Sequence, residues 1–337
     1  MSTVPLEPLP YATPASSLFD WREWLRRLGP FIGLAFVFGV FSFLTFKTFV
    51  TISNVKLLLQ QTSIVGIAAL GMTVIIISGG IDLSVGSNVA FCAVVVARLL
   101  ENNVSPVLAV LGGIVAGTLV GLIIGGLITG ARLSPFIATL GLMGAMRGTA
   151  IGSAGQTSVI YMPNALRGSW IASLMVNDSP DWWRLPVGVW IMLILAVIMA
   201  GVLRYTKFGR HVFAIGSNEQ TARLCGVNVW KSKLIIYSLA GALAAVAALL
   251  NFSQMHAGDS TTADGLELDV IAAVVIGGAS LSGGEGTILG SLAGALMMGA
   301  VANGCSLMGY DNWVQKIVTG GIILVAAGLD RLRHSKT

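Results

Sequence analysis

A short stretch of glycine, hydroxyl and acidic residues, 79–88, contains the first side chains that could handle a polar solute. Its sequence is GGIDLSVGSN, and Asp82 is the sole acid among residues 24–100. An acid beside apolar runs is costly in a membrane and marks either a transport pathway or a structural pair. Equally, Asp82 could cap the helix that follows or fix the loop. Three further side chains in this stretch offer hydrogen-bonding groups: Ser84, Ser87 and Asn88.

A second stretch, residues 276–287, repeats the pattern of the first. The sequences GGIDLSVGS and GGASLSGGEG share a Gly-Gly-x-x-Leu-Ser-x-Gly skeleton, and each follows an apolar run. A weak internal repeat is typical of transporters, although convergent use of glycine explains the match equally well. The letters LSGGE also match the signature of ABC-type ATPase subunits. The chain has no Gly-Lys pair, so it lacks the phosphate-binding loop of such enzymes.

A third stretch, residues 135–148, is a short apolar segment that begins with proline and contains three glycines. A helix interrupted by glycine or proline is a sequence pointer to a transport site. Thr139 lies within it as a candidate pathway residue. Arg147, near its end, could face a polar substrate, but we expect its side chain to reach out to the membrane interface instead.

A fourth stretch, residues 208–228, lies in a basic loop. Ser217 or Asn218 can cap a short helix that runs to about Leu224 and stops before Gly226. A short, basic, amphipathic helix of this kind has the form of a docking element for a soluble partner. Most loops of membrane proteins are only connectors, so the loop by itself is a moderate signal.

Residues for enzymatic chemistry are not grouped in this sequence. The three histidines are His211, His256 and His334, and the three cysteines form no Cys-x-x-Cys pair. No spacing indicates a Ser/His/Asp set or a metal site. We therefore expect no catalytic residue, no metal, no cofactor and no enzymatic activity.

The composition requires these stretches to be held by membrane helices. Hydrophobic residues make up 55% of the 337 residues and charged residues only 10%, against about a quarter charged in soluble proteins. At about 20 residues per span, the sequence predicts an all-α polytopic membrane protein with about ten helices, some short or broken. The predicted spans are 31–46, 57–78, 86–100, 107–128, 135–151, 186–203, 234–252, 270–280, 287–307 and 314–329.

The basic residues orient the spans. With the N-terminus inside, 13 of the 20 Lys and Arg fall on cytoplasmic loops, which explains the net charge of +5 without nucleic acid as a partner. Residues 1–29 form a cytoplasmic tail, in which Trp21, Trp24, Leu25 and Leu28 line one face of an interfacial helix. Residues 30–330 form the transmembrane domain, with an inner loop at 204–233, and residues 331–337 a cytoplasmic tail.

Four motifs together resemble a known family. They are GGIDLSVGS, PFIATLGLMGAMRG, FGRHVFAIGSNEQTARLCGVNV followed by Tyr237, and DVIAAVVIGGASLSGGEGT, in this order. The chain is similar to the membrane permease subunits of ribose-type ABC importers, which take up monosaccharides and related polyols. The resemblance runs from about residue 31 to residue 329.

The resemblance implies a permease of the bacterial inner membrane, with both termini cytoplasmic, that works as two copies. It also implies two further partners: a cytoplasmic ABC ATPase and a periplasmic sugar-binding protein. The inner loop would be the coupling element that binds the ATPase, and residues 79–87 would line or shape the path. The residues that match the coupling pattern lie at Gly209, Gly216, Asn218, Glu219, Ala222 and Gly226, whereas Ser217, Thr221 and Cys225 replace the commoner Gly, Ala and Ser.

Alternating access is the mechanism that these features favour. ATP binding to the partner would pull the helix bearing Glu219 and rock the bundle between inward- and outward-open states. Hydroxyl and amide groups along the path suit a neutral, hydroxyl-rich substrate. The alternative is an ion-coupled secondary transporter of a small polar solute that uses Asp82 as its ion site. That alternative predicts uptake without any ATPase.

Overall fold

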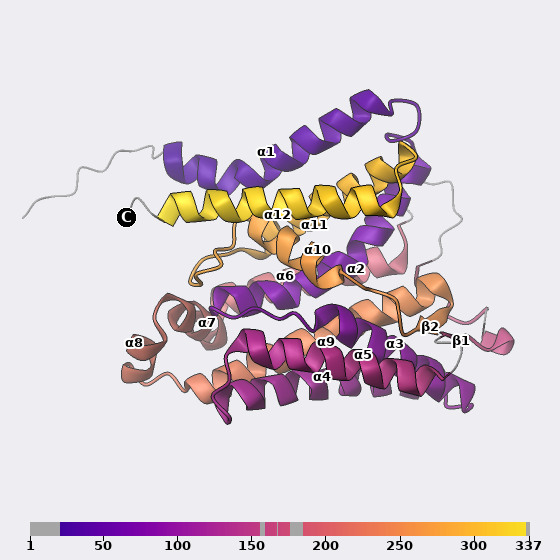
Figure 1. Ribbon diagram of the computed structural model, residues 1–337, viewed down its shortest axis with the longest axis horizontal. Coiled ribbons are helices and arrows are strands. Elements are labelled where there is room, and N and C mark those ends of the chain that lie inside the picture. The colour runs from indigo at the N-terminus through magenta and orange to yellow at the C-terminus, as the bar shows by residue number, and fades with distance from the viewer. Residues whose placement is uncertain (1–20, 156–158, 167, 176–184, 335–337) are drawn as a thin grey trace, which may run out of the picture.

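The computed structural model describes residues 21–155, 159–166, 168–175 and 185–334, most of which are helical. The long helices run side by side, with α7 and α8 at one end of the molecule and strands β1 and β2 at the other (Figure 1). The helices are α1 (Trp21–Leu44), α2 (Ile52–Ile77), α3 (Val85–Glu101), α4 (Pro106–Thr129), α5 (Pro135–Ala154), α6 (Val187–Tyr205), α7 (Lys207–Ser217), α8 (Glu219–Leu224), α9 (Val229–Met255), α10 (Leu266–Ile276), α11 (Ile288–Leu307) and α12 (Asn312–His334).

Each predicted span corresponds to one helix, so the all-α polytopic fold is confirmed. Among the described residues, α2, α4, α6, α9 and α11 are long and apolar enough to cross a membrane. Helix α3 has 17 residues and α10 has 11, and both spans were predicted to be short. Helix α5 has 20 residues and is longer than its predicted span.

The ends of the chain differ in detail from the predicted boundaries. Helix α1 begins at Trp21 and continues through Pro30, so the segment predicted as an interfacial helix is continuous with the first span. Helix α12 continues to His334, inside the predicted C-terminal tail. Four other parts of the orientation argument lie outside the described residues: residues 1–20, Arg167, Arg184 and Lys336.

A small antiparallel sheet joins two distant loops, and the sequence did not predict it. Strand β1 (Val159–Tyr161) pairs with β2 (Ala257–Asp259), with Ile160 opposite Gly258. A Cβ on Gly258 would lie 2.6 Å from the carbonyl oxygen of Ala93, so the sheet packs closely on α3. Strands of three residues are too short to leave a period-two pattern in the sequence.

Glycines bring α4 and α9 into backbone contact, because small residues let membrane helices approach closely. A Cβ on Gly117 would lie 2.6 Å from the carbonyl oxygen of Gly241. A Cβ on Gly121 would lie 2.7 Å from the carbonyl carbon of Tyr237. Helix α9 is therefore held against α4 with no side chain between the two backbones.

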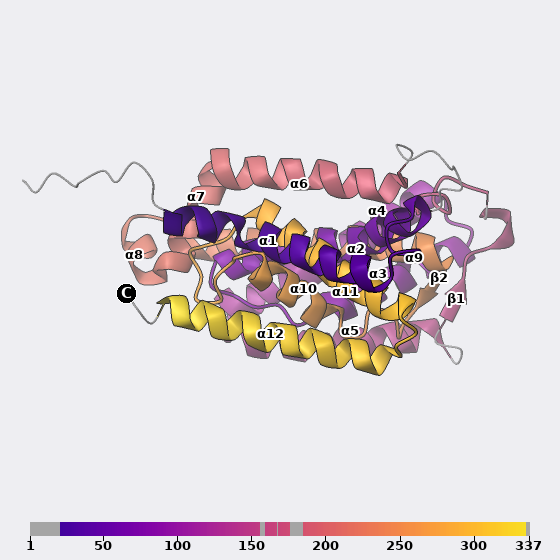
Figure 2. The same cartoon turned by 90° about the horizontal axis from the view of Figure 1, so that it is seen from above.

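Helix α6 lies along one edge of the bundle and α12 along the opposite edge (Figure 2). Exposed apolar side chains follow the outer face of α6, among them Trp190, Ile194 and Val197. In a membrane this face is solvated by lipid, which removes the penalty of exposing it to water.

Candidate coupling and translocation site

The first glycine-rich stretch ends α2 and turns the chain into an extended segment. Gly79, at a φ of +79°, adopts the left-handed conformation that glycine tolerates best. The N–H of Gly79 donates to the carbonyl of Ile76, and the N–H of Gly80 to that of Ile75, at 2.9 and 3.0 Å. This pair of bonds is the Schellman motif, which satisfies the last carbonyls of a helix. Helix α3 begins only at Val85.

Asp82 fixes the entry to α3. Its Oδ1 accepts hydrogen bonds from the backbone N–H of Ser84, at 2.8 Å, and from the Ser84 hydroxyl, at 2.6 Å. Both side chains are buried. Burial raises the pKa of the Asp82 carboxyl above its usual value, while the two bonds from Ser84 oppose that shift. The loop-fixing role of Asp82 is thus confirmed, and its contact with a substrate stays a prediction.

The second glycine-rich stretch builds the same turn at the end of α10. Gly278 has a φ of +90°, and the N–H of Ala279 donates to the carbonyl of Val274 at 3.1 Å. Ser280 then takes the place of Asp82: its hydroxyl lies 2.7 Å from the hydroxyl of Ser282 and accepts from the Ser282 N–H at 3.3 Å. Both stretches therefore end a helix with a left-handed glycine, although the turn lies one position later in the second stretch than the shared skeleton would place it.

The two glycine-rich stretches meet at the end of α7, where the second takes part through Gly283 and Gly284. The N–H of Gly284 donates to the carbonyl of Ile77 at 2.8 Å, which joins the α10–α11 connection to the end of α2. Gly216 lies against this joint: a Cβ at Gly216 would lie 2.6 Å from the Gly284 nitrogen and still closer to the Ile77 oxygen. A Cβ on Gly283 would in turn lie 2.7 Å from the Gly216 oxygen. Three chain segments thus touch through backbone atoms alone.

The predicted coupling helix is present as α8 (Glu219–Leu224), preceded by a helix that the sequence analysis did not predict, α7. Asn218 caps α8, because its side-chain oxygen accepts from the N–H of Thr221 at 2.9 Å. Gly209 lies in the first turn of α7, where its N–H donates to the Thr206 hydroxyl at 3.2 Å. Gly226 lies just beyond α8, and its N–H donates to the carbonyl of Arg223 at 3.1 Å.

Glu219 and Ala222 position α8 against the rest of the protein. The Glu219 carboxylate binds the Lys233 ammonium of α9 at 2.6 Å. Ala222 is buried and packs with Ile215 and Val229. The exposed face of α8 is formed by other residues, of which Leu224 is 88% exposed. An apolar side chain so exposed at the end of a helix is a candidate anchor for a partner protein. The sequence signal for this anchor was an apolar residue at the end of an otherwise polar helix.

The other predicted pathway residues lie close to the extended segment. Ser87 and Asn88 are buried in α3, and Asn88 accepts from the Cys92 thiol at 3.3 Å. Thr139 of α5 is fully buried, donates to the Pro135 carbonyl at 2.9 Å and lies 3.5 Å from the Ile81 carbonyl. All five predicted pathway residues are therefore within this region, whereas the coupling residues lie at the end of the bundle.

Arg147 is bound to a loop of the same chain, and its place at the membrane interface stays a prediction. Its Nη1 donates to the carbonyls of Ser260 and Thr262, both at 2.8 Å. Backbone carbonyls attract the guanidinium more strongly than distant water, because the charge strengthens each hydrogen bond. The loop that Arg147 binds leads into α10, whose Glu267 contacts Gly86 at the start of α3. The sequence analysis did not select Glu267.

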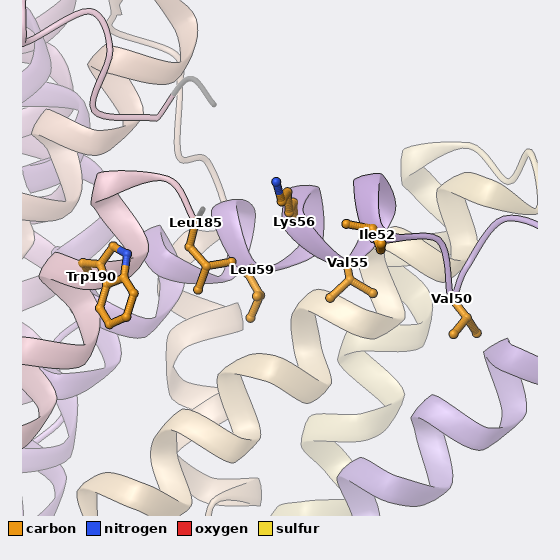
Figure 3. A pocket seen from close by; sticks show the side chains of 7 residues that line it. All are labelled: Val50, Ile52, Val55, Lys56, Leu59, Leu185 and Trp190. Atoms are coloured by element: carbon orange, nitrogen blue, oxygen red, sulfur yellow. The ribbon is translucent and has the colours of Figure 1, made fainter. Parts of the chain in front are cut away.

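A pocket of about 470 Å³ lies elsewhere, between the first turns of α2 and the start of α6. Figure 3 shows its lining side chains, with the Lys56 ammonium pointing away from Val55 and Leu59. The lining is otherwise apolar and offers few partners for the hydroxyls of a sugar. The described residues also contain no group of three His, Cys, Asp or Glu side chains placed to hold a metal ion.

Comparison with known proteins identifies close relatives. The family model described as branched-chain amino acid transport system / permease component matches residues 54–327. The ribose import permease protein RbsC of Bacillus subtilis is 40% identical over 92% of this chain and 94% of that protein. RbsC of Escherichia coli K12 is 38% identical, over 93% and 96% of the two chains. The L-arabinose ABC transporter permease protein AraH of Azospirillum brasilense is 34% identical, over 93% and 90%. No solved structure matches the chain significantly.

Proposed function

The chain belongs to the family of branched-chain amino acid transport system permease components, and we propose that it is the membrane subunit of an ATP-driven importer of monosaccharides. The sugar assignment is supported by the relatives and not by the family description. Proteins named as ribose and L-arabinose permeases match this chain over at least nine-tenths of both lengths. The polytopic fold with apolar helices supports a place in the bacterial inner membrane.

The contact at Gly216 is the observation that carries this proposal. Gly216 lies at the end of α7 nearest α8, so force applied to α8 reaches it directly. Its backbone lies against Ile77 at the end of α2 and against Gly284 of the α10–α11 connection. One turn ends α2 and leads to Asp82, and the other begins the connection to α11. A soluble partner that moves α7 by one to two ångströms would therefore move both turns together, because backbone atoms in contact cannot absorb the displacement.

The partners follow from the two ends of the molecule. A cytoplasmic ABC ATPase binds the end with α7 and α8, where Leu224 and Arg223 are exposed. A periplasmic sugar-binding protein binds the opposite end, near β1 and β2. The permease functions as two copies of this chain, with both termini on the ATPase side. The permease itself breaks no covalent bond, so it needs no catalytic residue.

The substrate path begins beside the extended segment 79–84 and passes the region of Asp82, Ser84, Ser87, Asn88 and Thr139. In the described structure the side chains of all five are buried. The path therefore opens only when the bundle rearranges, as alternating access requires. A neutral sugar exchanges hydrogen bonds with water easily, which suits a path that is lined by hydroxyl and amide groups and carries a single acid.

Reconstitution tests this function. The full-length permease is placed in liposomes with its cognate ATPase and the binding protein from the same operon, and uptake of labelled ribose, arabinose and allose is measured. We expect uptake of one or more sugars that requires internal ATP. Uptake that persists when the ATPase is omitted and collapses with an ion gradient would instead support the secondary transporter. A Leu224→Glu variant should lose ATPase binding in a pull-down, and Leu268→Glu, on the exposed surface of α10, should retain it.

A further inference from the structure

The side chain of Tyr237 has a buried polar end that the described structure does not pair. Tyr237 lies on α9 and is 2% exposed. Its hydroxyl has no hydrogen-bond partner among the described residues. Burying an unpaired hydroxyl costs free energy, and a buried tyrosine normally finds a partner for this group. In a protein that changes conformation during its working cycle, a hydroxyl can be unpaired in one state and hydrogen-bonded in another.

The two ends of Tyr237 touch different parts of the protein. Its backbone is held against α4, because a Cβ on Gly121 would lie 2.7 Å from the Tyr237 carbonyl carbon. Its hydroxyl lies against Gly80, where any Cβ would collide with the phenol oxygen. The ring thus reaches from the tightly packed pair of helices α4 and α9 to the extended segment that follows α2.

An acceptor lies in the extended segment that the hydroxyl touches. Asp82 is two residues beyond Gly80, against which the Tyr237 hydroxyl lies. The two bonds from Ser84 both go to Oδ1. An ionised carboxylate has about four acceptor positions on its two oxygens, so Asp82 can accept a further hydrogen bond without releasing Ser84.

The position of Asp82 relative to Tyr237 depends on α7. The turn before Gly80 is in backbone contact with Gly216 and Gly283, whereas Tyr237 is fixed to α4. A movement of α7 therefore shifts residues 79–82 relative to the Tyr237 ring, whose backbone is held against α4. We propose that Tyr237 is a positioning residue for transport: when the ATPase displaces α7, the Tyr237 hydroxyl donates to the Asp82 carboxylate and holds the extended segment in its second position. This inference rests on the proposed function, which supplies the movement.

The substitution Tyr237→Phe tests the proposed hydrogen bond to Asp82, and Ser238→Ala is a matched control. Ser238 is the next residue of α9, and its hydroxyl is also buried without a partner. Both variants remove an unpaired hydroxyl from the described state, so the unfolding temperature of the purified permease should stay the same or rise in both. Uptake by the complete importer should fall about tenfold in Tyr237→Phe alone, because only that variant loses a hydrogen bond of the second state.

Hydrogen exchange gives an independent readout. In the wild-type complex, peptides covering residues 78–88 should exchange more slowly when a non-hydrolysable ATP analogue is bound, and Tyr237→Phe should abolish this protection. A lower unfolding temperature of Tyr237→Phe would mean that the hydroxyl is already paired in the described state, and the proposal would fail. Normal uptake by Tyr237→Phe would also overturn it. If wild-type uptake itself needed no ATP, the proposed function would fail first, so the two failures are distinguishable.

Discussion

Replacing Gly216 by alanine is the sharpest perturbation of the contact between the coupling helices and the two glycine-rich turns. The added methyl would lie 2.6 Å from the Gly284 nitrogen, whereas ordinary van der Waals contact begins at 3.4 Å. Helix α7 or the turns must therefore separate by at least about 0.8 Å, and by more at the Ile77 carbonyl. That separation stretches the hydrogen bond of 2.8 Å between Gly284 and Ile77.

The size of the effect follows from these contacts. Overpacking a tight site costs about 1–3 kcal/mol, and loss of one backbone hydrogen bond adds about 0.5–1.5 kcal/mol. We expect Gly216→Ala to lower the free energy of unfolding by about 2–4 kcal/mol. Since about 1.4 kcal/mol corresponds to a factor of ten, uptake should fall tenfold or more if one conformation of the cycle bears this cost.

The assay compares ATPase binding, uptake and unfolding in the same preparation. The exposed side chains of α8 are unchanged in Gly216→Ala, so the ATPase should still bind in a pull-down while ATP-driven uptake is lost. Gly201→Ala is the control, because no atom lies within 4 Å of the added Cβ on α6. There alanine should be neutral or stabilise the helix by about 0.5–1 kcal/mol. Wild-type uptake by Gly216→Ala, with unfolding equal to that of the control, would refute the transmission argument.

Three further substitutions address the remaining contacts. Lys233→Met removes the ammonium that binds Glu219, so ATPase binding in a pull-down should weaken several-fold. The double variant Glu219→Lys, Lys233→Glu should restore binding. Normal ATPase binding by Lys233→Met would show that the pair does not orient α8. Asp82→Ala leaves the Ser84 donors unpaired and should lower the free energy of unfolding by about 1–3 kcal/mol. Asp82→Asn keeps an acceptor, so its free energy of unfolding should fall less. Equal decreases in the two variants would contradict the loop-fixing role of Asp82. Arg147→Ala removes the donor from two loop carbonyls, so amide hydrogens of residues 257–265 should exchange faster by mass spectrometry; unchanged exchange would mean that the loop is held by other contacts.

Local features of the fold were predictable because they depend on residues close in sequence. Each predicted span became a helix, Asn218 is one of the two predicted candidates for the cap of α8, and the end of α8 at Leu224 was predicted correctly. The loop-fixing role of Asp82 also uses a partner only two residues away. Hydropathy and capping are properties of a short window, so a single sequence is enough to find them.

The roles of the coupling residues were harder to predict. Glu219 and Ala222 were assigned to ATPase coupling, yet one binds Lys233 and the other is buried. The side chain that α8 exposes most is that of Leu224. On a helix of six residues, the inward and outward faces cannot be separated by periodicity, because fewer than two turns are present.

The amino-acid sequence by itself determined that the chain is a bundle of membrane helices, where α3, α4 and α11 begin and end to within one residue, and which motifs it shares with its relatives. Only the tertiary structure decided which backbones meet at Gly216, that Arg147 binds the carbonyl of a residue 113 positions away, and that the Tyr237 hydroxyl lies beside Gly80. The physical reason lies in the composition. Helices that are apolar on all sides carry no hydrophobic stripe to mark their buried face, so the choice of neighbours rests on close packing and paired polar groups between segments far apart in the chain.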